Sequence, residues 1–111
     1  MKKAYEVTIK DGDKIRHVTA KGYTLIGSVY QLAHYPNVYE NMICIKEISF
    51  ERYHTLNVAH AIREADTWEE CEEECVELCR LANMESEWRE ADDETFEAVI
   101  FEAAKKLNVE I

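Results

Sequence analysis

The pattern of apolar and polar positions at the start of the chain predicts two short strands joined by a tight turn. Apolar and polar residues alternate over 5–9, with the two-residue period of a half-buried strand. The Asp-Gly step at 11–12 supplies the positive φ angles that a hairpin turn needs, and 15–19 predicts the return strand. The register stays open, because Ile15 and Val18 lie on opposite faces of that strand.

A helix is predicted to follow the hairpin. Thr24 can accept hydrogen bonds from the first free backbone amides of such a helix. The apolar positions lie on one side of it: Leu25, Val29, Leu32 and Ala33. We expect Pro36 to end the helix, because the residue before a proline avoids helical backbone angles.

A long strand is predicted over 42–53, where β-branched and aromatic side chains are frequent. The apolar parity switches between Ile45 and Ile48. Two explanations remain open: a bulge near Lys46-Glu47, or a strand that is covered on both faces.

Helical periodicity fills the rest of the chain, beginning with a short amphipathic segment at 57–65. Thr67 and Glu70 have the spacing of a capping box, which predicts the start of a second helix. The apolar stripe of that helix is Trp68, Cys71, Cys75, Leu78, Cys79 and Ala82. Asp92 or Asp93 is predicted to cap the last helix, whose stripe is Phe96, Val99, Ile100, Ala103 and Leu107.

The predicted order is β-β-α-β followed by two to three helices. Strands that come first and helices that come last indicate an α+β fold, with the C-terminal helices packed on a small antiparallel sheet. A length of 111 residues suits a single domain spanning 1–111. The longest uncharged stretch is broken by polar residues and a proline, and no apolar leader follows the N-terminus. We therefore expect a cytoplasmic protein without membrane association.

The cysteine row Cys71, Cys75 and Cys79 has helical spacing and shares its stripe with Trp68 and Leu78. We interpret these thiols as small core residues. A soft-metal site or a redox centre remains an alternative, because three thiolates at this spacing are neighbours. Structural zinc sites, however, usually take paired cysteines from turns.

No catalytic motif accompanies these elements. The four histidines form no metal or nucleophile signature, and the three glycines form neither a phosphate loop nor a dinucleotide fingerprint. Exposed carboxylates on helices have nothing to separate their pKa values, which acid–base catalysis requires. We predict that the protein is not an enzyme and needs no cofactor.

Charge is the most unusual property of the sequence. The net charge is −10, yet residues 1–63 carry a balance of +3, whereas 64–102 carry sixteen Asp and Glu against two Arg. Such a field repels nucleic acid and attracts basic surfaces. The candidate partner-binding residues are Glu69, Glu70, Glu73, Glu77, Glu85, Glu87, Glu90, Asp93, Glu94 and Glu97. Acidic side chains in a first helical turn favour the helix dipole, and acidity aids solubility. Neither reason accounts for the scarcity of lysine partners.

Three further hypotheses stay open beside a charge-driven protein partner. One is that the acidity serves solubility alone, and another is cation binding by the carboxylates. The third is self-association, because the basic N-terminal half of one copy can attract the acidic half of another, which makes a homodimer an alternative.

The run from Glu69 to Glu97 resembles the acidic faces of small DNA-mimic and anti-CRISPR-type inhibitors that mobile elements encode. The resemblance is one of size and charge rather than of a motif. It implies a non-enzymatic inhibitor whose carboxylates stand in for phosphates in the nucleic-acid channel of a target such as a host-defence nuclease. The basic N-terminal half departs from a uniformly acidic mimic, and would face away from the target or meet a second surface.

Overall fold

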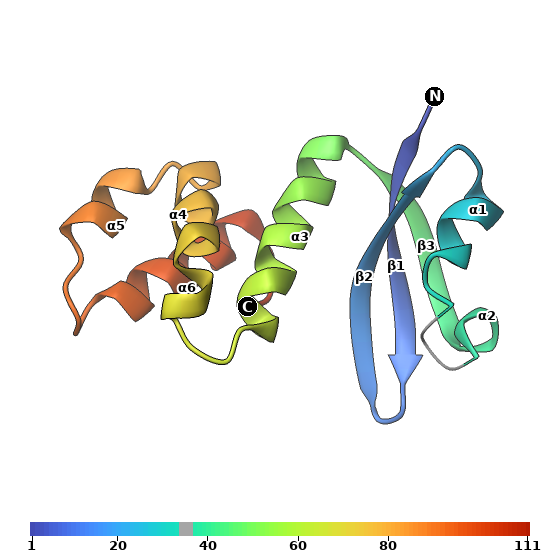
Figure 1. Ribbon diagram of the computed structural model, residues 1–111, viewed down its shortest axis with the longest axis horizontal. Coiled ribbons are helices and arrows are strands. Elements are labelled where there is room, and N and C mark those ends of the chain that lie inside the picture. Colours follow the sequence, from blue (N-terminus) through green and yellow to red (C-terminus); the bar gives the residue numbers. More distant parts are fainter. Residues whose placement is uncertain (34–36) are drawn as a thin grey trace. The chain divides into compact units, whose positions relative to one another are not determined.

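The computed structural model describes residues 1–33 and 37–111 (Figure 1). Contacts within the chain divide it into two compact units, Met1–Tyr53 and His54–Ile111. The first unit contains a three-stranded antiparallel sheet and the second is helical, so the predicted α+β class is confirmed. The single domain spanning 1–111 stays a prediction.

The sheet of the first unit has the strand order β2-β1-β3. It is formed by β1 (Lys3–Asp11), β2 (Lys14–Gly22) and β3 (Met42–Ile48). The turn between β1 and β2 contains Gly12, whose φ of 63° suits glycine, so the predicted hairpin is confirmed.

The structure also settles the hairpin register. Val7 pairs with Val18, and Lys10 pairs with Ile15. Val18 therefore packs against the core of this unit, whereas Ile15 is 51% exposed.

Two short helices complete the first unit, α1 (Leu25–Tyr30) and α2 (Val38–Asn41). Thr24 caps α1 as predicted, since its Oγ1 accepts a hydrogen bond from the backbone N–H of Gly27 at 3.0 Å. Of the predicted apolar stripe, two residues are buried (Val29 and Leu32) and two are exposed (Leu25 and Ala33). Pro36 lies outside the described residues. The core of the unit is Tyr5, Val7, Ile9, Ala20, Leu32 and Val38.

The strand predicted over 42–53 is too long. β3 ends at Ile48, and α3 (Phe50–Glu64) begins two residues later. Ser49 starts this helix, because its Oγ accepts a hydrogen bond from the N–H of Arg52 at 3.0 Å. The irregularity in pairing lies near Ile43 rather than Lys46-Glu47, because Thr8 pairs with Cys44 and the next residue of β1 pairs with Met42.

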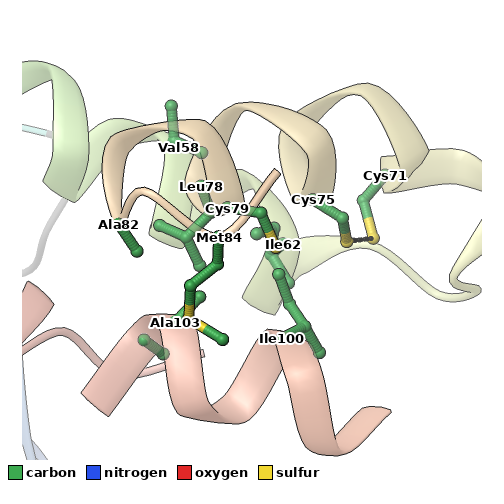
Figure 2. Close-up of a cluster of buried hydrophobic side chains, with 11 residues drawn as sticks. Val58, Ile62, Cys71, Cys75, Leu78, Cys79, Ala82, Met84, Ile100 and Ala103 are labelled. Atoms are coloured by element: carbon green, nitrogen blue, oxygen red, sulfur yellow. Dashed lines mark hydrogen bonds between the residues drawn. The ribbon is translucent and has the colours of Figure 1, made fainter. Parts of the chain in front are cut away.

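The second unit packs its helices around one apolar cluster. After α3 come a 3₁₀ turn η1 (Glu69–Cys71), α4 (Glu72–Leu81), α5 (Glu85–Glu90) and α6 (Phe96–Leu107). Figure 2 shows Leu78, Cys79 and Met84 directed toward Ile100 and Ala103 of α6. The predicted stripes of α4 and α6 thus face each other. Helix α5 was not predicted. No helix in the described part of the chain is long and apolar enough to cross a bilayer.

Candidate functional site

The acidic segment begins at the predicted capping box. The N–H of Glu70 donates to Thr67 Oγ1 at 3.3 Å, and the Glu70 carboxylate accepts from the N–H of Asp66 at 3.2 Å. The return bond of the box therefore reaches one residue further back than the usual pattern. The chain makes a 3₁₀ turn before the regular helix α4 begins at Glu72.

The predicted partner-binding carboxylates lie on the surface of the second unit. Nine of the ten residues are exposed, and Glu77 has intermediate exposure. They come from η1, from α4, from α5, from the turn that follows α5 and from the first turn of α6. Their exposure agrees with the prediction that these side chains face outward.

The chain itself neutralises few of these charges. Glu77 pairs with Arg80, and His54 Nε2 lies 3.9 Å from Glu77 Oε1. Glu97 accepts a hydrogen bond from Trp68 Nε1 at 3.2 Å. Among residues 1–33 and 37–111, none of the other nine candidate carboxylates has an ion pair within 4 Å.

The boundary between the two units is also a boundary of charge. Met1–Tyr53 contains eight Lys and Arg and six Asp and Glu, a net charge of +2. His54–Ile111 contains five Lys and Arg and seventeen Asp and Glu, a net charge of −12. The negative field therefore belongs to the helical unit rather than to the protein as a whole.

A groove of about 630 Å³ opens among α4, α5 and the start of α6. Its apolar lining includes Trp68, Val76, Trp88 and Phe96. Five carboxylates and one guanidinium surround these side chains: Glu69, Glu72, Glu85, Asp92, Asp93 and Arg89. The charged lining has a net formal charge of −4, so the groove combines aromatic surface with negative potential.

The aromatic rings of the groove hold one another in place. Phe96 meets Trp68 with ring centroids 5.5 Å apart and Trp88 at 6.1 Å, both edge to face. Trp68 also contacts Phe101 edge to face at 6.3 Å. Phe101 lies outside the predicted apolar stripe of α6, packs against Trp68 and remains 51% exposed.

The N-cap position of α6 is Thr95 rather than Asp92 or Asp93 as predicted, and Asp92 instead organises the turn before the helix. Its Oδ1 accepts hydrogen bonds at 3.0 Å from the N–H of Glu94, from the N–H of Thr95 and from Thr95 Oγ1. The hydrogen bond from the Thr95 hydroxyl and those from the backbone amides lower the pKa of Asp92 from its ordinary value. Its neighbour Asp93 is exposed and belongs to the groove lining.

The cysteine row lies in the core of the helical unit, as its spacing predicts. Cys71, Cys75 and Cys79 are 2% exposed or less, and the Sγ atoms of Cys71 and Cys75 lie 3.8 Å apart (Figure 2). Desolvation raises the pKa of Cys75, with the neighbouring Cys71 thiol adding to the effect, and desolvation raises that of Cys79 to about 11. Neutral, buried thiols act here as small apolar side chains.

Sequence reasoning missed the groove and its tryptophan from α5. Trp88 lies twenty positions after Trp68 on a helix that the sequence did not predict. Glu72 was missed as well, although it precedes the exposed Val76 by one helical turn. The available signal was Val76 itself, an apolar residue outside the predicted apolar stripe of that helix.

Comparisons with known proteins give no assignment: no protein-family model, no curated protein and no solved structure matches this chain.

Proposed function

We propose that this protein is a non-enzymatic inhibitor or regulator that binds a basic, nucleic-acid-binding surface of a target protein through the acidic face of its helical unit. The acidic face consists of the ten predicted carboxylates between Glu69 and Glu97. A nuclease of host defence is the kind of target that the resemblance to DNA-mimic inhibitors implies.

One observation supports the proposal above the others. In the described part of the chain, Glu77 is the one candidate carboxylate with an ion-pair partner, and the helical unit keeps a net charge of −12. Like charges one helical turn apart destabilise a helix by about 0.2–0.5 kcal/mol per pair. A cationic surface that covers the face removes this repulsion and gains the complementary attraction.

The groove adds the apolar contact that charge alone lacks. Interfaces gain most of their affinity from a few desolvated anchors, often aromatic, with charged groups around them. Trp68 and Trp88 are partly buried and line the groove beside the carboxylates. An aromatic centre with an acidic rim suits a protein partner better than a role in solubility alone.

Capture from native lysate with two charge-matched variants tests the proposal. The test variant replaces four exposed carboxylates outside the groove with their amides: Glu73, Glu87, Glu90 and Glu94. The control replaces four exposed carboxylates elsewhere: Asp13, Glu40, Glu102 and Glu110. Both variants have a net charge of −6 instead of −10.

We expect the wild type and the control to retain the same protein, with retention falling steeply as salt rises. The test variant should lose it at a lower salt concentration than the control. Equal retention by both variants would overturn the proposal, because net charge rather than the acidic face would then determine binding.

A further inference from the structure

We propose that the groove among α4, α5 and α6 binds arginine side chains of the partner protein. The inference rests on the proposed function, because it assigns the partner's chemistry at one part of the acidic face. It goes further in predicting a preference between the two basic residue types, which a purely electrostatic face does not have.

The aromatic lining supplies the first half of arginine recognition. Trp68 and Trp88 each meet the Phe96 ring at nearly a right angle, with interplanar angles of 88° and 86°. The Trp68 Nε1–H donates to Glu97, which fixes the indole. A planar guanidinium stacks on such rings and is more weakly hydrated than an ammonium group.

The acidic rim supplies the second half. Asp92 uses a carboxylate oxygen to cap its own turn, whereas Glu69, Glu72, Glu85 and Asp93 have no ion pair among the described residues. Carboxylates accept the paired N–H groups of a guanidinium in a bidentate geometry. Arg89 also lines the groove. The five carboxylates of the lining outweigh this single positive charge and leave a net charge of −4, so the groove still attracts a cation.

The size and mixed lining of the groove favour a peptide segment over a metal ion. About 630 Å³ lies within the range of sites for organic ligands, roughly 300–1,000 Å³. A metal site gathers oxygen ligands around a point, whereas this groove places tryptophan and phenylalanine among its carboxylates. The negative lining excludes a phosphate backbone. Charge complementarity therefore selects a basic segment with guanidinium groups.

Capped octa-arginine and octa-lysine peptides test the inference directly. They carry the same charge, so a face that acts only through its field binds them alike. The chain contains two tryptophans and both line the groove, so tryptophan fluorescence reports its occupancy. At 150 mM salt we expect octa-arginine to bind about five- to tenfold more tightly, and to shift both indole N–H resonances.

Matched variants locate the binding. Replacing Glu72 with Gln and Asp93 with Asn removes two rim charges, whereas the control Glu73→Gln/Glu94→Gln removes the two neighbouring charges outside the groove. The rim variant should lose about tenfold in octa-arginine affinity, and the control about threefold or less. Trp88→Leu keeps an apolar side chain against the core, and should abolish the preference for arginine while leaving Trp68 as the reporter.

Two results would overturn the inference: equal affinity for the two peptides, or equal losses in the rim variant and its control. Neither result contradicts the proposed function, because the capture experiment that tests it alters Glu73, Glu87, Glu90 and Glu94, which lie outside the groove lining. Conversely, arginine selectivity without any effect of the Glu73, Glu87, Glu90 and Glu94 amide variant on capture would keep the groove assignment and remove the proposed function.

Discussion

A lysine placed at Val76 should test directly whether the carboxylates around that position lack cationic partners. Val76 is 45% exposed on α4 and lines the groove. A lysine there lies four residues after Glu72, three after Glu73 and four before Arg80. The first two neighbours attract it, with the glutamate N-terminal to the lysine in the better orientation, and the third repels it.

The magnitude follows from these neighbours. Two favourable pairs and one unfavourable pair, each about 0.2–0.5 kcal/mol, leave a net stabilisation of about 0.2–0.5 kcal/mol in low salt. The remaining carboxylates of the groove add to it. Glutamine has a helix propensity similar to that of lysine, so Val76→Gln removes the same apolar side chain without adding charge. The difference between the two variants isolates the electrostatic contribution.

Thermal unfolding followed by circular dichroism provides the assay. In 20 mM salt the lysine variant should melt about 1–3 °C above the glutamine variant. In 1 M salt, where the screening length is about 3 Å, the gap should close. Equal melting temperatures in low salt would refute the reasoning, because they would mean that the surrounding carboxylates are already neutralised. So would a gap that persists in high salt, since packing rather than charge would then cause it.

Three further predictions concern the turn before α6 and the core. Thr95→Val removes the hydroxyl hydrogen bond to Asp92 and should raise the pKa of that carboxyl toward its ordinary value of 3.8. Because that pKa is lowered in the folded protein, Asp92 stabilises the fold at pH values above the ordinary pKa, and this contribution is lost as the pH falls through the lowered pKa. Carbon-detected NMR titration should find a higher Asp92 pKa in the variant, and the stability of the variant should depend less on pH in this range. An unchanged Asp92 pKa would contradict the assignment. Ellman's reagent at pH 8 should modify one thiol of the native protein, the exposed Cys44, and four thiols in denaturant. Burial raises the pKa of Cys79 to about 11. The stability that the neutral Cys79 thiol contributes is therefore complete below the ordinary pKa of 9.0 and is lost as the pH rises toward 11. Rapid native modification of two or more thiols would place the cysteine row outside the core. Leu78→Ala should cost about 2.7–5 kcal/mol in urea unfolding, and a loss below about 1 kcal/mol would mean that its site is not closely packed.

Local signals in the sequence predicted much of the fold. The Asp-Gly turn and the cap at Thr24 depend on neighbouring residues alone, so Gly12 and Thr24 were identified correctly. Thr67 accepts the predicted hydrogen bond from the Glu70 N–H, but the N-cap of η1 is Trp68 and that of α4 is Cys71. The stripes that α4 and α6 carry followed from helical spacing. Cys71, Cys75, Leu78, Cys79, Ala82, Ile100 and Ala103 are buried, whereas Trp68, Phe96, Val99 and Leu107 are partly buried. The strand over 42–53 was wrong because Phe50 and Tyr53 have high strand propensity, whereas Ser49 starts a helix there through its backbone and hydroxyl oxygens.

The candidate site was predictable in its charges and not in its shape. Exposure of Glu69, Glu70 and Glu73 follows from their position away from the Cys and Trp stripe. The groove depends on tertiary packing, because Trp68, Trp88 and Phe96 come from separate elements and meet only when α4, α5 and α6 assemble. The predicted face also contains Glu77, whose pairing with Arg80 depends on side-chain geometry that the sequence does not fix.

Competition with nucleic acid tests the central claim most directly. The captured partner, purified and loaded with a fluorescent nucleic acid that it binds, should release that nucleic acid as this protein is added. The Glu73, Glu87, Glu90 and Glu94 amide variant should need a clearly higher concentration to do so than the charge-matched control. Simultaneous binding of both ligands without displacement would contradict the account, because the acidic face would then not occupy the surface that phosphates use.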